Sequence, residues 1–426
     1  MTRHFWVLLH RYAGLFMAFF LVVAGLTGSV LAFYQEIDHW LNPEQYQVPV
    51  QDRAMLDPFE LRERALTLLP KAEINIVRFR REPGEVYSVT YKPEITDGQP
   101  DMQKYNVLRL NPYTGDLIEL SEVSLDTGYW PLTRKNILTF IYDLHYKLAL
   151  GEFGVWLFGI VAVVWTLDCF VGFYLTLPAR RKASQQDKNN LTNRTFWARW
   201  AVAWKIKWYS STYRLNFDLH RASGLWTWVM LFVFAWSSVD FNLNQQVYQP
   251  VMKTLFTMTD FATFPRAKLL EPKPKPALDW HTAHAIGQQL IAEQGQQQGF
   301  KILAEDQLFY DPEKAVFGFV LRSDQDIVNQ GGITTIYFDG DSGALVESNS
   351  LFNKNSGDTI TFWLWTLHMA RIWGLPYKIF VCLMGLVVAM LSITGVYLWL
   401  KKRKASALSK AKRGKLGPNS HDIRRL

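Results

Sequence analysis

The sequence predicts an integral membrane α-helical bundle of four transmembrane helices, formed by a duplicated two-helix unit, with two periplasmic α+β domains. Three observations predict this fold class. Four strongly apolar segments reach the length of a membrane span, the motifs of the first half recur in the second, and each half has a long polar segment between its two apolar segments. The mean hydropathy of −0.04 hides this segregation, because apolar and polar windows average out.

The four apolar segments are predicted to be helices that cross the bilayer. A helix rises about 1.5 Å per residue, so about 20 apolar residues span a hydrocarbon core of about 30 Å. The segments lie at about Tyr12–Tyr34, Phe153–Leu177, Leu219–Phe241 and Lys378–Leu400. The 17 Trp and 18 Tyr residues agree with this prediction, because both types gather at the membrane–water interface. The lipid bilayer is therefore the first expected partner.

Basic residues beside the apolar segments predict how the chain is oriented. They concentrate in residues 179–217 and in the tail that begins with Lys401 and Lys402. Because Lys and Arg in short loops stay cytoplasmic, both termini are expected in the cytoplasm. The two long polar segments then lie outside, in the periplasm if the membrane is a bacterial inner membrane. The net charge of +8 forms no basic folded face, so no nucleic-acid partner is expected.

These assignments divide the chain into consecutive parts. The parts are a first transmembrane helix (1–34), a periplasmic domain (35–140), a periplasmic-edge segment with the second helix (141–178), a basic cytoplasmic loop (179–217), a third helix (218–241), a second periplasmic domain (242–360), a periplasmic-edge segment with the fourth helix (361–400) and a basic cytoplasmic tail (401–426). No nucleotide-binding motif occurs in any of them.

Matched motifs indicate that the chain is an internal duplication. The matched segments are His10–Leu15 with His220–Leu225, Leu144–His145 with Leu367–His368, and Gly172–Leu175 with Gly395–Leu398. The first match has a spacing of 210 residues and the other two a spacing of 223, so the second polar segment is 13 residues longer. Both halves share one orientation, and we therefore expect a pseudo-two-fold axis along the membrane normal.

The two polar segments are each predicted to fold as one helix on a short antiparallel sheet. Amphipathic helices are expected near 57–69 and 277–294. Alternating β-branched and aromatic residues predict strands at Val86–Tyr91 and Val316–Leu321. A glycine-containing turn follows in each segment, in residues 110–116 and 338–344.

Four of the nine histidines occupy matched positions, one beside each predicted span. They are His10, His220, His145 and His368. The expected axis would bring His10 to face His220 and His145 to face His368. Two facing imidazoles inside a helical bundle suit axial ligation of haem iron. Because no C-x-x-C-H motif is present, we expect haem b, held without a covalent bond, in two groups whose iron is bound by these four histidines.

Residues next to the histidines suit the rest of a haem. Arg11 and Arg221 follow the inner histidines and are expected to pair with propionates. Arg371 and Lys147 are candidates for the same role beside the outer histidines. Gly14 and Gly224 lie four residues after His10 and His220, on the same helix face, where a missing side chain leaves room for a porphyrin.

Three further ionisable residues have competing interpretations. Asp168 lies at membrane depth, where it is either a proton relay or partner of a hydroxyl, or a residue that caps or hydrogen-bonds near the inner half of its helix. His281 and His284 lie one helical turn apart, as in a metal site. A solvated helix face is the favoured interpretation for this pair, since the first half has no equivalent and no acidic or Cys residue is near in sequence.

The motifs together resemble the PepSY-associated transmembrane family. Leu9–Gly14, Gly25–Gly28 and Leu41–Pro43 resemble the opening of that family, as does Leu219–Trp226. Asn111–Gly115 and Asp339–Gly343 resemble PepSY domains. The second half departs from the first in having Ser237-Ser238 where the first has Thr27-Gly28.

The resemblance implies a bacterial inner-membrane protein and, for several members of the family, a role in iron uptake. Several members resemble haem-containing reductases that release iron from ferric siderophores in the periplasm. The haem-ligand histidines of the family carry over to the same four positions of this chain. The longer second polar segment leaves the identity of the substrate open.

The favoured function is therefore enzymatic, that of a ferric siderophore reductase and transmembrane electron-transfer oxidoreductase. A cytosolic reductase or a membrane quinol is the expected donor, and a ferric siderophore or another ferric complex the expected acceptor. Ferrous iron binds hard oxygen ligands more weakly than ferric iron, so one electron loosens such a complex. No catalytic side chain is assigned.

Two other functions remain as alternatives. In the first, PepSY domains bind a peptide or a peptidase, the helices only anchor them, and the histidines are structural. In the second, the protein transports iron or a siderophore. Transport needs discontinuous helices or a polar pathway, whereas the four spans, apart from Asp168, are expected to be plain packing surfaces.

Overall fold

The computed structural model describes residues 2–91, 104–124, 129–179, 195–260, 264–349 and 355–415. The chain divides into two compact units. The helical unit comprises Met1–Ala32, Thr139–Pro250 and Pro376–Leu426. The sheet unit comprises Phe33–Leu138 and Val251–Leu375. Each unit is therefore assembled from segments that are far apart in the sequence.

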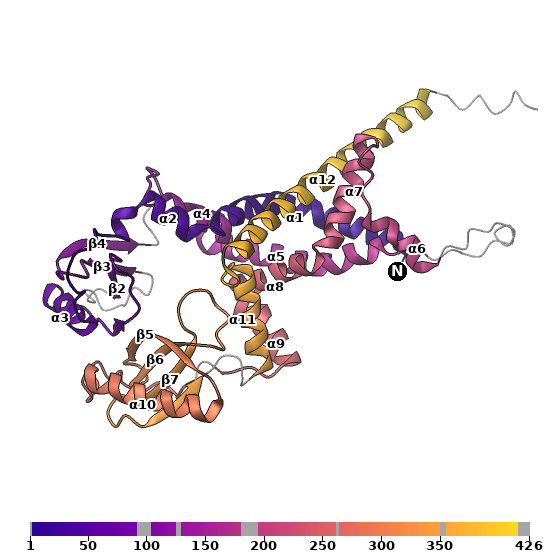
Figure 1. Ribbon diagram of the computed structural model, residues 1–426. Helices are drawn as coiled ribbons and strands as arrows, with labels where there is room; N and C mark the ends of the chain where they lie inside the picture. Colours follow the sequence, from indigo (N-terminus) through magenta and orange to yellow (C-terminus); the bar gives the residue numbers. More distant parts are fainter. Residues whose placement is uncertain are drawn as a thin grey trace, which may run out of the picture. The chain divides into compact units, whose positions relative to one another are not determined.

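Long apolar helices build the helical unit, whose α-helices are labelled in Figure 1. They are α1 (Arg3–Leu31), α4 (Ile137–Lys147), α5 (Gly151–Thr176), α6 (Phe196–Trp200), η3 (Ala201–Trp204), α7 (Thr212–Trp226), α8 (Trp228–Leu243), η4 (Asn244–Tyr248) and α12 (Gly374–Lys415). Helix α9 (Gln249–Leu255) begins in this unit, but most of its residues belong to the sheet unit. Three helices, α1, α5 and the part of α12 up to Ser409, are each long and apolar enough to cross a membrane. The strongly apolar segments at the first, second and fourth predicted positions are thus confirmed as helices.

The third predicted span is not one straight helix. Its residues belong to α7 and α8, which meet at an angle of 71° around Thr227, so the chain has a fourth candidate span only if this bent pair counts as one. The hydroxyls of Ser223 and Thr227 donate to the carbonyls four residues earlier, and Gly224 lies between them. Such back-bonding beside a glycine bends helices. The expectation that every span is a plain helix is therefore wrong here.

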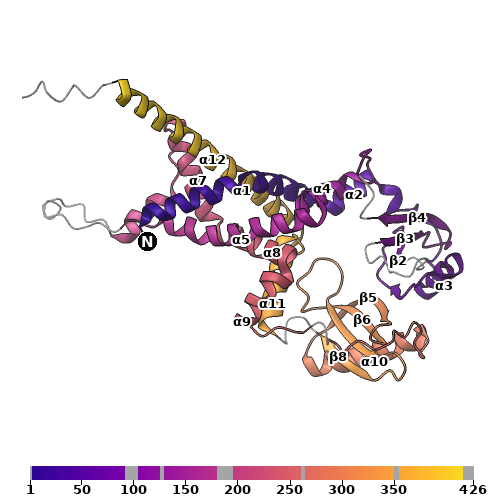
Figure 2. The same ribbon diagram turned by 180° about the vertical axis from the view of Figure 1, so that it is seen from behind.

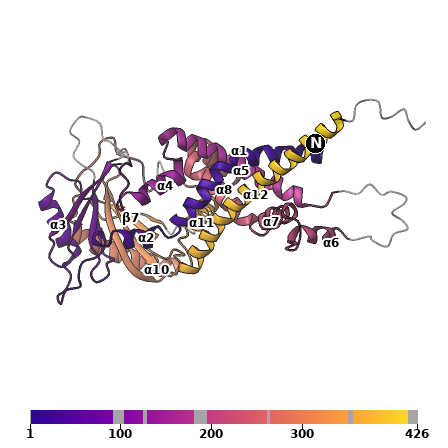
Figure 3. The ribbon, with the colours of Figure 1, turned by 90° about the horizontal axis from the view of Figure 1, so that it is seen from above.

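Small residues bring α1 and α12 into direct backbone contact. A Cβ at Gly25 would lie 2.5 Å from the carbonyl oxygen of Gly385, and the hydroxyl of Ser29 donates to the carbonyl of Cys382 at 2.8 Å. Contacts of this kind hold helices together in lipid, where burial of apolar surface gives no preference for a protein neighbour. Figure 2 shows α12 crossing α1 obliquely, and Figure 3 shows the same helices from another direction.

The sheet unit contains two antiparallel sheets and the helices that accompany them. Its helices are α2 (Tyr34–Leu41), η1 (Pro43–Gln45), α3 (Pro58–Leu68), α10 (Trp280–Gln298) and α11 (Ser356–His368). Its strands are β1 (Ile76–Arg78), β2 (Tyr87–Tyr91), β3 (Lys104–Leu110), β4 (Leu117–Ser124), β5 (Ile302–Asp311), β6 (Val316–Ser323), β7 (Thr334–Asp339) and β8 (Leu345–Asn349). The strand orders are β2-β3-β4 and β1-β5-β6-β7-β8. The predicted helices near 57–69 and 277–294 and the two predicted strands are confirmed.

Strand β1 crosses from the first polar segment into the sheet of the second. It pairs with β5 antiparallel, with Val77 opposite Leu308. The guanidinium of Arg62 on α3 also lies over the ring of Trp280 on α10, 4.1 Å from its centroid. Backbone pairing and side-chain stacking therefore join the two predicted modules, a link that the local sequence patterns did not predict.

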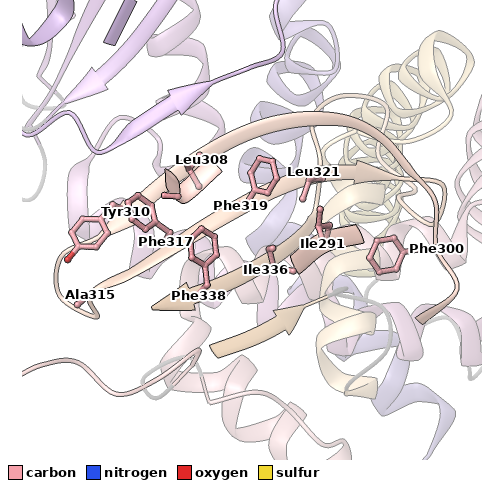
Figure 4. Packing of buried hydrophobic residues seen from close by; sticks show 11 residues of the cluster. Ile291, Phe300, Leu308, Tyr310, Ala315, Phe317, Phe319, Leu321, Ile336 and Phe338 are labelled. Carbon is pink, nitrogen blue, oxygen red and sulfur yellow. The ribbon is translucent and has the colours of Figure 1, made fainter. Parts of the chain in front are cut away.

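Aromatic rings fill the space between α10 and the larger sheet. Figure 4 shows Phe317, Phe319 and Phe338 on neighbouring strands, and all three are fully buried. The rings of Phe317 and Phe338 are stacked with centroids 5.5 Å apart. A Cβ at Gly287 of α10 would lie 2.9 Å from Phe319, so glycine allows the helix to approach the sheet closely.

The two predicted turns have the same hydrogen bonds, which supports the duplication. Between β3 and β4, Asn111 accepts from the amide of Gly115 at 2.8 Å and donates to the carbonyl of Asp116 at 2.9 Å. Between β7 and β8, Asp339 makes the same two bonds with Gly343 and Ala344, at 3.0 and 2.9 Å. Both glycines have φ near +73°, a value that glycine adopts without strain.

Candidate haem-binding site

The structure brings the two inner histidines together in the helical unit. His10 lies on α1 and His220 on α7, and their ring centroids are 6.1 Å apart with the planes inclined by 62°. A metal ion bonded to one nitrogen of each ring at roughly 2 Å keeps the two centroids roughly 6 Å apart. The separation of the two rings therefore suits a single shared metal ion.

Each inner histidine packs against its own partner helix in the same way. The Cε1 atom of His10 lies 3.4 Å from the position that a Cβ would occupy at Gly172 on α5, and its Nδ1 atom lies 3.8 Å away. For His220 and Gly395 on α12, the two distances are again 3.4 and 3.8 Å. These glycines belong to a matched pair of the sequence repeat, although the sequence did not show that they support the histidines.

Hydrogen bonds occupy the Nδ1 atoms of these two rings. His10 Nδ1 lies 2.9 Å from both carboxylate oxygens of Asp168. His220 Nδ1 lies 3.0 Å from the carbonyl oxygen of Leu391 and 3.1 Å from the hydroxyl of Thr394. Histidines that bind metals commonly donate one ring N–H to a carboxylate or carbonyl, which leaves the lone pair of the other nitrogen for the metal. Among the described residues, no side chain or carbonyl hydrogen-bonds to Nε2 of either ring.

The third candidate, His145, is bound in the same manner. It lies on α4, and its Nδ1 atom is 3.0 Å from both the carbonyl oxygen of Ala24 and the hydroxyl of Thr27 on α1. The ring packs over Gly28, where a Cβ would lie 2.9 Å from Cε1. Thr27 and Gly28 belong to a motif on which the family resemblance rests, but their role was visible only in the structure.

His368, the fourth candidate, is the last residue of α11 and belongs to the sheet unit. It follows a short helix that precedes α12, as His145 lies on a short helix that precedes α5. The predicted pairing of His145 with His368 joins residues of different units and stays a prediction.

The two arginines predicted to bind propionates differ in their surroundings. Arg221 donates to the carboxylate of Asp218 at 2.8 Å and to the carbonyl of Val202 at 2.9 Å. Its Nε atom is buried without a partner among the described residues. Arg11 makes no hydrogen bond or ion pair within the described part of the chain. Arg11 is therefore the more available of the two cations.

The space next to the inner histidines is open at the two predicted glycines. A Cβ at Gly14 would meet nothing within 4 Å, and one at Gly224 would meet only Leu391 at 3.8 Å. On the outer side, Lys147 forms an ion pair with Asp143 at 3.0 Å, which occupies one of the two outer candidate cations.

Arg371 contributes to a cavity of about 260 Å³ in the sheet unit. The cavity is lined by Val328, Gln330, Gly331, Gly332, Ile333, Phe362, Trp365, Thr366, Met369 and Arg371. It lies beside the C-terminal end of α11, the helix that ends at His368. Aromatic rings, backbone and one guanidinium thus surround a small space next to a candidate ligand.

The pair on the outer helix has structural contacts. His284 Nε2 lies 2.7 Å from Glu305 and its ring stacks on Phe79, while His281 stacks on Phe59. No group of three or more His, Cys, Asp or Glu residues suited to a metal ion occurs in the described part of the chain. His281 and His284 therefore pack α10 against residues of the first polar segment, a role that neither interpretation made from the sequence included.

The chain matches a known protein family. The family described as the PepSY-associated TM region matches residues 7–402, nearly the whole chain. The chain belongs to this family. No curated protein shows a significant match to the sequence. Membership and the apolar helices establish a PepSY-associated membrane protein whose bilayer-spanning helices accompany two β-sheets.

Proposed function

We propose that this PepSY-associated protein is a haem-containing reductase that carries electrons across the bacterial inner membrane to ferric iron in the periplasm. The observation that carries the proposal is the pairing of His10 and His220, 6.1 Å apart, each with Nδ1 already hydrogen-bonded. When bound, haem supplies a one-electron carrier whose potential its ligands set. The residues of this chain hold and orient it.

The inner group would be held by His10 and His220, with Gly14 and Gly224 leaving space for the ring and Arg11 offering a cation to a propionate. The outer group would use His145, which α1 already orients through Ala24 and Thr27, together with His368. These ligand sets correspond to two b-type groups without covalent attachment. In this proposal the bent pair α7 and α8 forms the fourth span, the termini are cytoplasmic, and the two α+β domains are periplasmic PepSY domains.

A ferric siderophore is the proposed acceptor, and a cytosolic reductase or a quinol the proposed donor. The cavity lined by Trp365 and Arg371 supports a ligand site in the sheet unit, because a guanidinium attracts the anionic groups that bind ferric iron. The cavity lies beside the helix that ends at His368, which would place an acceptor near the outer ligand of its own unit.

The transport alternative gains one feature from the structure, the break at Thr227. That break is explained by hydroxyl back-bonding and a glycine, so it does not by itself indicate a pathway. The peptide-binding alternative predicts a colourless purified protein, because a protein whose histidines are only structural binds no haem.

An absorption spectrum of the detergent-purified chain, recorded before and after dithionite, tests the proposal. We expect a Soret band, sharp α and β bands on reduction, and two haem groups per chain. The reduced protein should then be reoxidised by a ferric siderophore faster than by the same siderophore loaded with gallium, which has no comparable reduction. A colourless protein that stays colourless after incubation with haem would rule out the reductase and favour the peptide-binding module.

A further inference from the structure

The two inner histidines differ in the charge of the group that binds Nδ1. His10 faces the carboxylate of Asp168, with both oxygens at 2.9 Å, whereas His220 faces the neutral carbonyl of Leu391 and the hydroxyl of Thr394. Asp168 and Leu391 occupy the same position of the repeat, at the spacing of 223 residues that relates α5 to α12. The two halves of the repeat therefore differ at the residue that hydrogen-bonds to the inner histidine.

The other surroundings of the two rings are matched. Each ring has its Cε1 atom 3.4 Å from the Cβ position of a glycine on its partner helix. His145, in the same unit, also has neutral Nδ1 partners, the carbonyl of Ala24 and the hydroxyl of Thr27. The Nδ1 hydrogen bonds of His145 and His220 go to neutral groups, whereas that of His10 goes to a carboxylate.

Asp168 has no cationic side chain to neutralise it within the described residues. It is 9% exposed, and its only hydrogen-bond partner there is His10. A carboxylate at this depth is costly unless a group donates to it, and such residues in membrane helices tend to be functional. The imidazole N–H is the available donor, so the carboxylate fixes the proton on Nδ1 and leaves Nε2 with its lone pair.

We propose that Asp168 is a positioning residue that holds His10 in this tautomer and lowers the reduction potential of the iron shared by His10 and His220. The inference rests on the proposed haem ligation. A carboxylate behind an imidazole raises its basicity as a ligand and stabilises the ferric state, which has one more positive charge than the ferrous state. The one electron that such a haem would accept would come from the cytosolic reductase or quinol of the proposed function, and its transfer would make or break no bond.

The two sides of the inner site thus differ in charge. With an anion behind one ligand, the inner group would be a stronger reductant than the same pair with two neutral partners.

The experiment is a redox titration of the full-length holoprotein in detergent, followed by optical and low-spin EPR spectra. Asp168→Asn keeps the shape and a hydrogen-bond acceptor but removes the charge. We expect this variant to retain two haem groups, to show a higher midpoint potential for one of them and a changed EPR signal for that group alone. Thr394→Val, which removes only a neutral hydroxyl beside His220, is the matched control and should shift the potential much less.

A reciprocal variant covers the case in which Asp168→Asn loses the inner haem. Thr394→Asp introduces a carboxylate beside His220 Nδ1, and it should lower the potential of the inner group further. Unchanged potentials and EPR spectra in a haem-loaded Asp168→Asn or Thr394→Asp protein would overturn this inference and leave the proposed ligands intact. Absence of haem from the unsubstituted protein would instead overturn the proposed function.

Discussion

His145 packs directly over Gly28, so that a Cβ atom at residue 28 would lie 2.9 Å from Cε1 of the imidazole. The neighbouring hydroxyl of Thr27 lies 3.0 Å from Nδ1 of the same ring. The first transmembrane helix therefore sets the position of a histidine that belongs to α4, 117 residues further along the chain (145 − 28). Glycine provides the space and threonine the hydrogen bond.

Replacing Gly28 by alanine should displace the His145 ring. Overpacking of this kind costs about 1–3 kcal/mol, because the added methyl group and the imidazole ring would occupy the same space. We expect Gly28→Ala to lower the thermal midpoint of the haem-free protein, measured by circular dichroism in detergent. Gly14→Ala is the matched control, since its Cβ meets nothing within 4 Å. An equal midpoint for the two variants would contradict the packing argument.

Histidine replacements should separate the two proposed haem groups. His10→Ala and His220→Ala are expected to remove one group, and His145→Ala and His368→Ala the other, so each variant retains about half of the haem measured as pyridine haemochromogen. The two pairs should lose different low-spin EPR signals. His4→Ala, in the first turn of α1 but outside the matched positions of the repeat, is the control and should keep both groups. Full haem content in both outer variants would mean that the outer ligands are wrongly assigned.

The contact between His284 and Glu305 predicts a pH dependence of stability in the sheet unit. The hydrogen bond from His284, and then that from Gln288, lower the pKa of Glu305 below its ordinary value of 4.5 despite partial burial. A lowered pKa stabilises the fold above the ordinary value, and this stabilisation is lost as the pH falls through the lowered one.

The unfolding midpoint should therefore fall between pH 6 and pH 3 by a larger amount in the unsubstituted protein than in Glu305→Gln, which has no carboxylate to protonate. Glu293→Gln, an exposed change on α10, should keep the original pH dependence. Identical pH dependence in all three proteins would show that this contact does not contribute to the pH dependence of stability.

Asp218 on α7 is the acidic residue of a buried ion-pair cluster. Its side chain is fully buried and accepts from Arg214 at 2.9 Å and from Arg221 at 2.8 Å. Removing one partner of a buried pair costs roughly 3–5 kcal/mol, and we expect the lower end because Arg214 is 39% exposed. Asp218→Asn should show this loss in chemical unfolding. Glu44→Gln, which breaks an exposed pair with Arg134, should cost less than about 1 kcal/mol. Equal losses would contradict the burial argument.

The sequence alone determined the features that depend on local pattern. Apolar runs located α1, α5 and α12, because a span has to be apolar along its whole length whatever it packs against. The repeat located the four histidines and the two glycine turns, since duplicated motifs stay recognisable without any knowledge of contacts. Alternation of side chains located β2 and β6 for the same reason.

The tertiary structure decided which groups meet. The Nδ1 partners of His10 and His145 lie 158 and 118 to 121 residues away along the chain, and the pairing of β1 with β5 joins two different polar segments. Such contacts depend on how packed helices rotate and cross and on which strand edge is free to pair. The hydropathy pattern of the sequence determines neither. The bend at Thr227 likewise follows from two hydroxyls that turn back to their own helix, a choice that packing makes and that apolar periodicity conceals.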